Sequence, residues 1–363
     1  MRVEGLGAEE QGEGAGKALA ETKGPASTAK VFFLFVDGLG VGEPDPTVNP
    51  LVAARMPNLA ALVPGWPPTL DKAGTTWARL VGPRSGDPAD AGLPEGEGRA
   101  GAVMVEAAWI PIDANLGVEG LPQSATGQTT LFTGVNAAQA VGRHVSAFPT
   151  GRLREILREH SIFKVLSQAG RKAVFINTFS RDYLGALDDR SVRASASTLA
   201  ALAGAEPLRT VTDHLAGRAV YQDITGEILV ARGFDVPLRE PWEAGRVAAR
   251  AALETDFAMF EYFLTDRAGH SQEMEKASAV LERLDGFVGG LVAGYDLSRN
   301  LLVICSDHGN VEDLTVPTHT RHPVPLMALG LGAGRFAEGV RSLSDVAGRL
   351  IRLASHPSDP LAP

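Results

Sequence analysis

Residues 301–313 have the sequence LLVICSDHGNVED, and Thr-His-Thr follows at residues 318–320. The apolar run at 301–305 predicts a strand, and it stops abruptly before Asp307 and His308, with His319 arriving soon afterwards. In open α/β sheets, reactive groups lie just past the carboxyl ends of strands. Asp oxygen and His nitrogen are ligands that suit Zn²⁺ or Mn²⁺. The stretch therefore predicts a metal site, with an Asp-His pair that merely ends a strand as the alternative.

Two other apolar runs end in the same way. Residues 31–36 (VFFLFV) lead into Asp37 in a Gly-rich turn, and residues 257–264 (FAMFEYFL) lead to Asp266 and His270. The turn after Asp37 lacks the Gly-x-Gly-x-x-Gly spacing, which argues against dinucleotide binding. A single Asp or His at such a place is most often structural. Three strand ends of one type indicate instead that these side chains form a common site.

A fourth segment, residues 121–134 (LPQSATGQTTLFTG), places hydroxyl groups just before a helix predicted at 128–132. The N-terminus of a helix favours a phosphate because its N–H groups are unpaired. Ser124 or Thr126 could be a nucleophile there if a metal lowers the hydroxyl pKa. The alternative is that these side chains only cap the helix.

Composition limits the classes of function. The chain has 363 residues, 44% of them hydrophobic, with 41 Gly and 23 Pro, which indicates a large α/β protein with many loops. A net charge of −9 argues against nucleic acid or an anionic membrane as partner. The single cysteine, Cys305, rules out an internal disulfide and fits a cytoplasmic location. No apolar stretch is long enough to cross a bilayer.

The domain organisation follows from the pattern of elements. Residues 1–29 are predicted to be a flexible tail, and residues 30–355 a single enzyme domain with an insertion at about 67–120. The insertion could be a small accessory sheet, a lid or a surface excursion, with an exposed loop at 82–101. After residue 150, helices and strands alternate as in a doubly wound sheet. The helices are predicted at 153–168, 195–203, 219–232, 242–255 and 273–292, and a strand at 173–177.

The four segments, in this order, resemble the alkaline phosphatase superfamily, and within it the branch of cofactor-independent phosphoglycerate mutase and phosphopentomutase. The resemblance covers about residues 30–332. It implies a three-layer αβα sandwich with a mostly parallel central sheet and a small inserted subdomain. It also implies two divalent metal ions, Mn²⁺ or Zn²⁺. The implied ligands are Asp37, Asp307 and His308 for one ion, with Ser124 reaching it, and Asp266, His270 and His319 for the other.

The resemblance implies a two-metal phosphoryl-transfer enzyme that acts on a small phosphorylated substrate. Ser124 would attack in line to give a phosphoseryl intermediate, with Thr126 as the second choice. Hydrolysis of a phosphate ester is favoured over a mutase, because core helices and strands fill most of the segment between Ser124 and Asp266 and leave little room for a cap. The approach to Asp266 also lacks the histidine of the glycerate mutases. Arg143 and His144 are weaker candidates for substrate contacts, with an exposed loop pair as the alternative.

Two other readings are less favoured. A sulfatase would need a Cys-x-Pro-x-Arg context, which the Ser124 segment lacks, and Cys305 is misplaced for it. A non-catalytic binding protein that keeps the fold would be expected to have lost a ligand, whereas every expected position is present. The substrate, the metal and the oligomeric state are left open.

Overall fold

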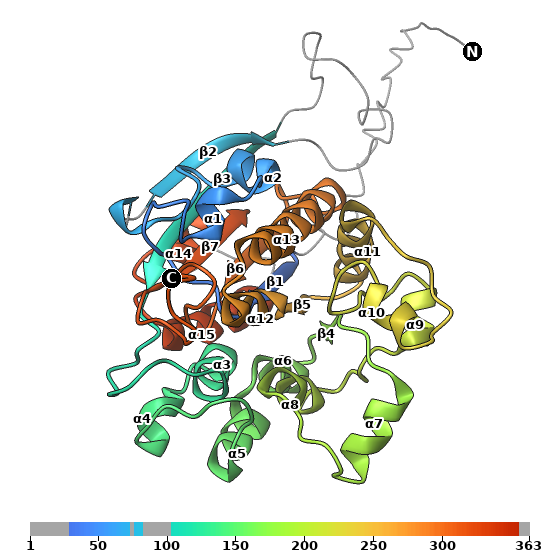
Figure 1. Ribbon diagram of the computed structural model, residues 1–363. Helices are drawn as coiled ribbons and strands as arrows, with labels where there is room; N and C mark the ends of the chain where they lie inside the picture. Colours follow the sequence, from blue (N-terminus) through green and yellow to red (C-terminus); the bar gives the residue numbers. More distant parts are fainter. Residues whose placement is uncertain (1–28, 73–75, 83–102, 356–363) are drawn as a thin grey trace, which may run out of the picture.

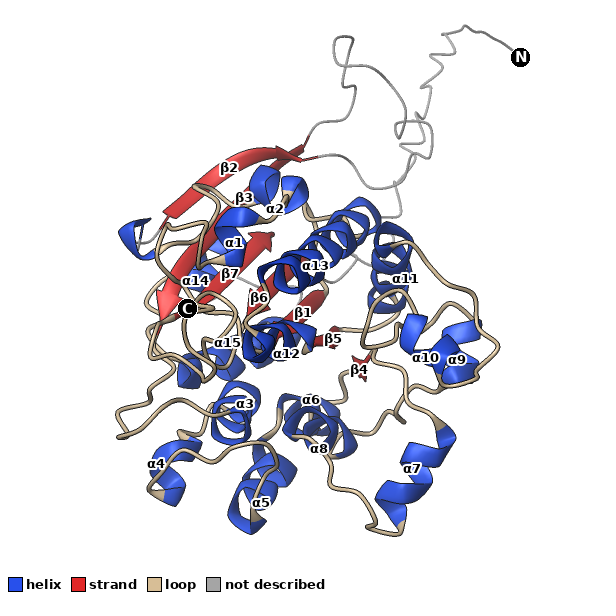
Figure 2. Cartoon of the chain, viewed as in Figure 1, coloured by secondary structure: helices blue, strands red, loops and turns tan. Residues whose placement is uncertain are grey.

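The computed structural model describes residues 29–72, 76–82 and 103–355. Its centre is a seven-stranded sheet of order β2-β3-β7-β6-β1-β5-β4 (Figure 2). β1 lies parallel to both β5 and β6, and β4 lies parallel to β5, whereas β7 is antiparallel to β6 and β3, and β2 to β3. The sheet is therefore mixed, with three parallel and three antiparallel pairings, and five of its seven strands run in one direction, in line with the predicted mostly parallel sheet. The strands are β1 (Val31–Val36), β2 (Thr76–Gly82), β3 (Val103–Ile112), β4 (Ala173–Phe175), β5 (Phe257–Tyr262), β6 (Leu301–Cys305) and β7 (Val324–Gly330).

Helices cover both faces of this sheet (Figure 1). Alternate side chains of β1 enter two separate hydrophobic cores, with Phe32 in one and Phe33 in the other. This explains why the strand is apolar at every position. The first core includes residues of α11 (Pro241–Leu253) and α13 (Met274–Gly294). The second includes residues of α3 (Ser124–Thr133), α6 (Ile162–Gln168), α8 (Ala196–Leu202) and α15 (Val346–Ser355). The predicted three-layer αβα sandwich is confirmed.

The remaining helices have ten residues or fewer. They are α1 (Pro50–Ala53), α2 (Pro57–Leu62), α4 (Ala137–Val141), α5 (Gly151–His160), α7 (Arg181–Asp188), α9 (Val211–Leu215), α10 (Glu227–Ala231), α12 (Leu264–Ser271) and α14 (Ala333–Ala337), with 3₁₀ turns at Leu70–Lys72 and Leu343–Asp345. The helix predicted at 153–168 is two helices, because Ser161 has an extended backbone and its hydroxyl accepts the N–H of Lys164 to cap α6.

The helix predicted at 219–232 is wrong over its first half. Only α10 is helical there, because the preceding residues form a turn around Asp223. The Asp223 carboxylate accepts the N–H groups of Gly226 and Ile228, and Ile224 has a positive φ of 70°. A short polar side chain that bonds its own following backbone competes with helix formation, and residues 219–226 show this effect.

The described part of the predicted insertion belongs to the main sheet. β2 and β3 extend the sheet beyond β7, so residues 76–82 and 103–112 form no separate lid. Residues 1–28 of the predicted tail and most of the predicted loop at 82–101 lie outside the described residues. Within the described ranges, no helix combines the length and the apolar character needed to cross a membrane.

One buried histidine makes the fold sensitive to acid. His214 is fully buried, and the Arg239 guanidinium donates to its Nε2 at 2.6 Å. Burial, with help from Arg239, lowers the pKa of His214 to about 4. The folded state therefore binds fewer protons than the unfolded state between this value and the ordinary pKa of 6.5, so stability falls as the pH falls through that window.

We expect the free energy of unfolding of the wild type to fall by about 2 kcal/mol more than that of His214→Gln between about pH 7.5 and about pH 5. Glutamine keeps an acceptor for Arg239 and does not titrate. Urea unfolding at a series of pH values measures the difference. Parallel stability curves for the two proteins would show that His214 does not titrate as described.

Candidate metal centre

The sheet order brings the three predicted strand ends together. β1 lies between β5 and β6, and all three strands run in the same direction. Asp37 directly follows β1, Asp307 follows β6, and Asp266 lies in the first turn of α12, just after β5. Residues far apart in the sequence thus meet at one edge of the sheet.

The first group contains Asp37, Asp307 and His308. His308 Nε2 lies 3.3 Å from Asp37 Oδ1 and 3.5 Å from Asp307 Oδ2. Ser124 Oγ lies 3.0 Å from the same nitrogen. Asp37 Oδ1 and Asp307 Oδ2 are buried without any hydrogen-bond partner. Two orphaned carboxylate oxygens facing one imidazole nitrogen are the arrangement expected of a site for a cation.

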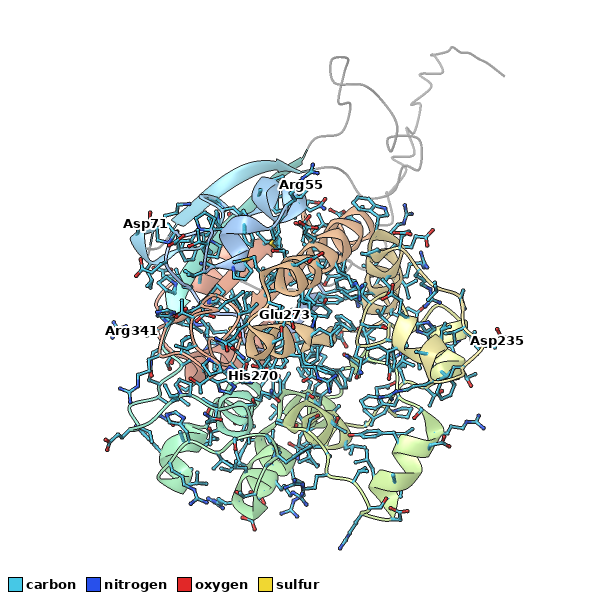
Figure 3. All side chains as sticks on the ribbon, viewed as in Figure 1. Arg55, Asp71, Asp235, His270, Glu273 and Arg341 are labelled. Carbon is cyan, nitrogen blue, oxygen red and sulfur yellow. The ribbon has the colours of Figure 1, made fainter. Side chains whose placement is uncertain are left out.

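The second group contains Asp266, His270 and His319. His270, labelled in Figure 3, lies in the last turn of α12, and its Nε2 lies 3.4 Å from Asp266 Oδ2. His319 Nε2 lies 3.5 Å from Asp266 Oδ1. The Nδ1 atoms of both histidines lie within hydrogen-bond distance of backbone carbonyls, those of Pro317 and Pro122. A carbonyl only accepts, so each Nδ1 must carry the proton and each Nε2 offers a lone pair to an ion.

The two groups are direct neighbours. The rings of His308 and His319 stack with their centroids 3.7 Å apart. Gly38, which has a positive φ of 69°, lies so close to Asp266 that an added Cβ would approach its Cα to 2.9 Å. A two-ion site therefore fits into one compact cluster, divided between the ions as the resemblance implies.

The electrostatics of the unloaded site favour a cation. Burial and the neighbouring Asp307 raise the pKa of Asp37 well above its usual value, and burial with the charge of Asp266 raises that of Asp307 to about 7. Burial lowers the pKa of His308 and of His319. Carboxylates crowded away from water repel one another, and a divalent cation would offset both the repulsion and the lost hydration. The oxygen and nitrogen donors, with no sulfur among them, fit such an ion.

Glu312 holds the loops of the site in place. Its side chain is 1% exposed, and its Oε2 accepts the backbone N–H groups of Gly40 and Asn310 at 2.9 and 2.7 Å. Its Oε1 accepts from Thr320 and lies 3.1 Å from His322 Nδ1. Hydrogen bonding to Glu312 raises the pKa of His322. One carboxylate thus ties the loop after β1 to both ends of the loop that carries His308 and His319.

Ser124 is the first residue of α3, which begins four residues before the predicted helix at 128–132. Gln123 precedes the helix without a side-chain cap, so the interpretation of Ser124 as a cap is wrong. Gly127 lets α3 approach the site, since an added Cβ would lie 2.8 Å from the Asp307 carbonyl oxygen. Thr126 is fully buried, and its hydroxyl donates to the Gln123 carbonyl and accepts the N–H of Val145. Because this hydroxyl is held within the protein, Thr126 does not face the site.

A cleft of about 770 Å³ adjoins the cluster, and Asp37, Ser124 and Asp266 form part of its wall. Arg143 and His144 do not line it. Arg143 is exposed, and His144 Nε2 lies 3.3 Å from the carbonyl of Val118. The segment from 177 to 232 supplies much of the cleft wall. The prediction that core helices and strands fill most of this segment therefore missed its contribution to the cleft.

Several residues of this wall were missed from the sequence. They include Arg193, Arg232, Arg267 and Glu261. Glu261 carried a recognisable signal, because it is a charged residue inside the apolar run of β5. Its Oε2 accepts from Ser197 at 2.7 Å, and burial raises its pKa to about 7. Arg193 and Arg232 gave no such signal, because they lie in irregular or weakly patterned segments, whereas Arg267 directly follows the predicted ligand Asp266.

Removing the support of Glu312 is expected to destabilise the protein. Glu312→Ala leaves the buried N–H groups of Gly40 and Asn310 without an acceptor, at about 1–3 kcal/mol each. Glu312→Gln keeps an acceptor oxygen and should lose much less. Chemical denaturation compares the variants, and equal stability of Ala and Gln would contradict the role given to Glu312.

If the two groups each hold an ion, Asp307→Asn and Asp266→Asn should each lower the metal content of the purified protein from about two ions per chain towards one, because each removes a charged ligand. Elemental analysis after dialysis measures the content. Asp313→Asn is the matched control, since its carboxylate lies on the same loop but accepts from Thr315. A full content in both ligand variants would refute the assignment.

Residues 239–356 match the family model described as the Metalloenzyme superfamily. A 2,3-bisphosphoglycerate-independent phosphoglycerate mutase from Acetivibrio thermocellus is 33% identical over 101 residues, which are 26% of this chain and 19% of the relative. One from Yersinia pestis is 32% identical over 114 residues, 30% of this chain and 22% of the relative. The chain thus matches about a fifth of the length of these relatives.

Two solved structures are also similar. The PH0037 protein from Pyrococcus horikoshii has a TM-score of 0.49 at 15% identity, over 91% of this chain and 98% of that one. The alkaline phosphatase from the Antarctic bacterium TAB5 has a TM-score of 0.46 at 12% identity, over 91% and 99%. The matched residues 239–356 carry Asp266, His270, Asp307, His308 and His319. The predicted resemblance to metalloenzymes and to cofactor-independent phosphoglycerate mutase is confirmed for this part of the chain.

Proposed function

We propose that this protein is a two-metal-dependent phosphoryl-transfer enzyme that hydrolyses a phosphate ester through a phosphoseryl intermediate on Ser124. The observation that carries the proposal is the position of the Ser124 hydroxyl. It lies 3.0 Å from His308 Nε2, at the first residue of α3, and it lines the cleft beside Asp37 and Asp266. A hydroxyl at a helix N-terminus beside two acidic clusters is well placed to meet a phosphoryl group.

The metal assignments are part of this proposal. Asp37, Asp307 and His308 would hold one divalent ion, and Asp266, His270 and His319 the other, with Mn²⁺ and Zn²⁺ as candidates. When bound, such ions neutralise phosphoryl charge and favour the ionised form of a nearby hydroxyl. His270 and His319 are held in the tautomer that this requires by the carbonyls of Pro317 and Pro122.

The chain's own residues define the two steps. Ser124 Oγ forms a bond to phosphorus while the bond from phosphorus to the ester oxygen breaks, and the alcohol leaves with the electron pair and takes up a proton. Water then attacks the phosphoserine, so that inorganic phosphate leaves and Ser124 recovers its proton. The positive N-terminal end of α3 would favour the negative phosphoryl group in both steps.

Access of water favours hydrolysis over the mutase alternative. Ser124 is only half-buried, and the cleft beside it has exposed rim residues such as Val192 and Arg232. The strands of the insertion lie in the sheet, and none of its described residues lines the cleft. The mutase alternative is supported by the names of the partial relatives, and transfer to a second substrate hydroxyl would need only the same phosphoserine.

A cytoplasmic location stays a prediction from the single cysteine.

Ser124→Ala should lower turnover of phosphate esters by at least about 10³-fold, because the variant lacks the attacking oxygen. It should still bind metal, since the three ligands of the first group remain. Phosphorus NMR on metal-reconstituted protein with a pool of sugar phosphates, phosphoglycerates and a phosphodiester measures the products. Released inorganic phosphate indicates a hydrolase, and phosphate that moves within the substrate indicates a mutase.

Thr126→Val provides the comparison. Valine keeps the shape of the side chain but loses the hydrogen bonds to Gln123 and Val145, so the variant should be less stable than the wild type. It should still form the phosphoenzyme, because Ser124 is unchanged. Acid quenching followed by mass spectrometry locates the phosphate. Phosphothreonine at Thr126, or undiminished turnover by Ser124→Ala, would overturn the assignment of the nucleophile.

A further inference from the structure

The cleft beside the metal centre is lined by three cationic side chains as well as by the carboxylates of Asp37, Glu261 and Asp266. Arg193, Arg232 and Arg267 line it together with Ser124 and Asp37. They come from different parts of the chain: the segment before α8, the end of α10 and the first turn of α12. The protein as a whole carries a charge of −9, so three cationic side chains around one cleft are a local feature and do not reflect a basic surface.

Two of the three arginines rest against an aromatic ring of the same cleft. The Arg193 guanidinium lies 4.6 Å from the centre of the Phe148 ring. The Arg267 guanidinium lies 5.2 Å from that of Phe263. A ring in this position limits the freedom of a long side chain and leaves its N–H donors available.

Arg232 is braced in a different way. Its Nη1 donates to the Tyr221 hydroxyl at 3.1 Å, and Tyr221 also lines the cleft. This bond uses only part of the guanidinium, which has five N–H donors. All three arginines are thus oriented by aromatic residues of the cleft wall.

None of these contacts neutralises the arginines. Elsewhere in the protein, Arg218 pairs with Asp213 at 2.8 Å and Arg283 with Glu227 at 3.1 Å. Throughout the described ranges, no carboxylate lies within ion-pair distance of the three cleft arginines. Oriented guanidinium groups without an acidic partner are suited to bind a carboxylate or phosphate of a ligand.

We propose that Arg193, Arg232 and Arg267 form a second anion subsite, and that the substrate is a phosphate ester whose alcohol part carries a further carboxylate or phosphoryl group. The proposal rests on the proposed function, because it places the scissile phosphoryl group at Ser124. The cleft volume of about 770 Å³ is large enough for a ligand that extends from the metal centre to these arginines. The second anion selects the substrate and takes no part in bond breaking.

Kinetics with matched esters tests the subsite. The substrates are alkanediol bisphosphates of increasing chain length, phosphorylated hydroxyalkanoates of the same lengths, and the corresponding alkyl monophosphates. We expect kcat/KM for one ester with two anionic groups to exceed that of its partner with a single phosphate group roughly tenfold or more, since charge-assisted bonds to guanidinium are strong. Arg193→Gln, Arg232→Gln and Arg267→Gln should each reduce this ratio, mainly through KM. The bisphosphate and carboxylate arms show which anion the subsite takes.

Arg246→Gln is the control for removal of a positive charge, because Arg246 is an exposed residue of α11 outside the cleft. Its ratio should equal that of the wild type. A ratio near one at every chain length, or an undiminished ratio in all three cleft variants, would overturn the proposal.

Calorimetry separates the subsite from the proposed function. Metal-loaded Ser124→Ala is titrated with alkane bisphosphonates and with monophosphonates, neither of which is hydrolysed. Bisphosphonates that bind more tightly than monophosphonates, and lose this advantage on Arg→Gln substitution, support the subsite. If the wild type then hydrolyses no ester, the proposed function is refuted but the subsite is not. Equal binding of both ligands would refute the subsite.

Discussion

The repulsion between buried carboxylates is the constraint around which this molecule is built. Asp37 and Asp307 lie within one cluster, each with an oxygen that has no hydrogen-bond partner. Such an arrangement is unfavourable for the apoprotein and must be held by the surrounding structure. The central strands fix the backbone, Glu312 ties the loops, and Gln128 donates to Asp37 Oδ2. The fold thus holds these carboxylates at positions where they repel one another, which is common at functional sites.

The sequence allowed prediction of the features that depend on strong local patterns. Continuous apolar runs identified β1, β5 and β6, and the rule that reactive residues follow strand ends brought Asp37, Asp266 and Asp307 together. The order of the strands could not be derived in this way, because pairing between β1 and strands more than two hundred residues later is set by the whole core. Boundaries failed where a single side chain redirects the backbone, as Ser161 and Asp223 do.

The wall of the cleft was the least predictable part. Arg193 and Arg232 lie in segments whose composition resembles ordinary surface, and only the packing of these segments against the sheet places them near Ser124. The two candidates chosen for sequence proximity, Arg143 and His144, lie elsewhere. A position soon after α3 in the sequence therefore does not predict a position near Ser124 in the structure. Specificity depends on tertiary placement, whereas the metal cluster is encoded in short motifs.

The central position of β1 has a consequence for the synthesis of the chain. Among the strands that the structure describes, β1 is synthesised first, yet its two neighbours, β5 and β6, begin at residues 257 and 301. The strand VFFLFV therefore has both edges unpaired until residues 257–305 have been synthesised. Unpaired apolar edges are prone to intermolecular association. Of the residues proposed as metal ligands, His319 is translated last. The native pairing of β1 is thus a late event in the synthesis of this chain.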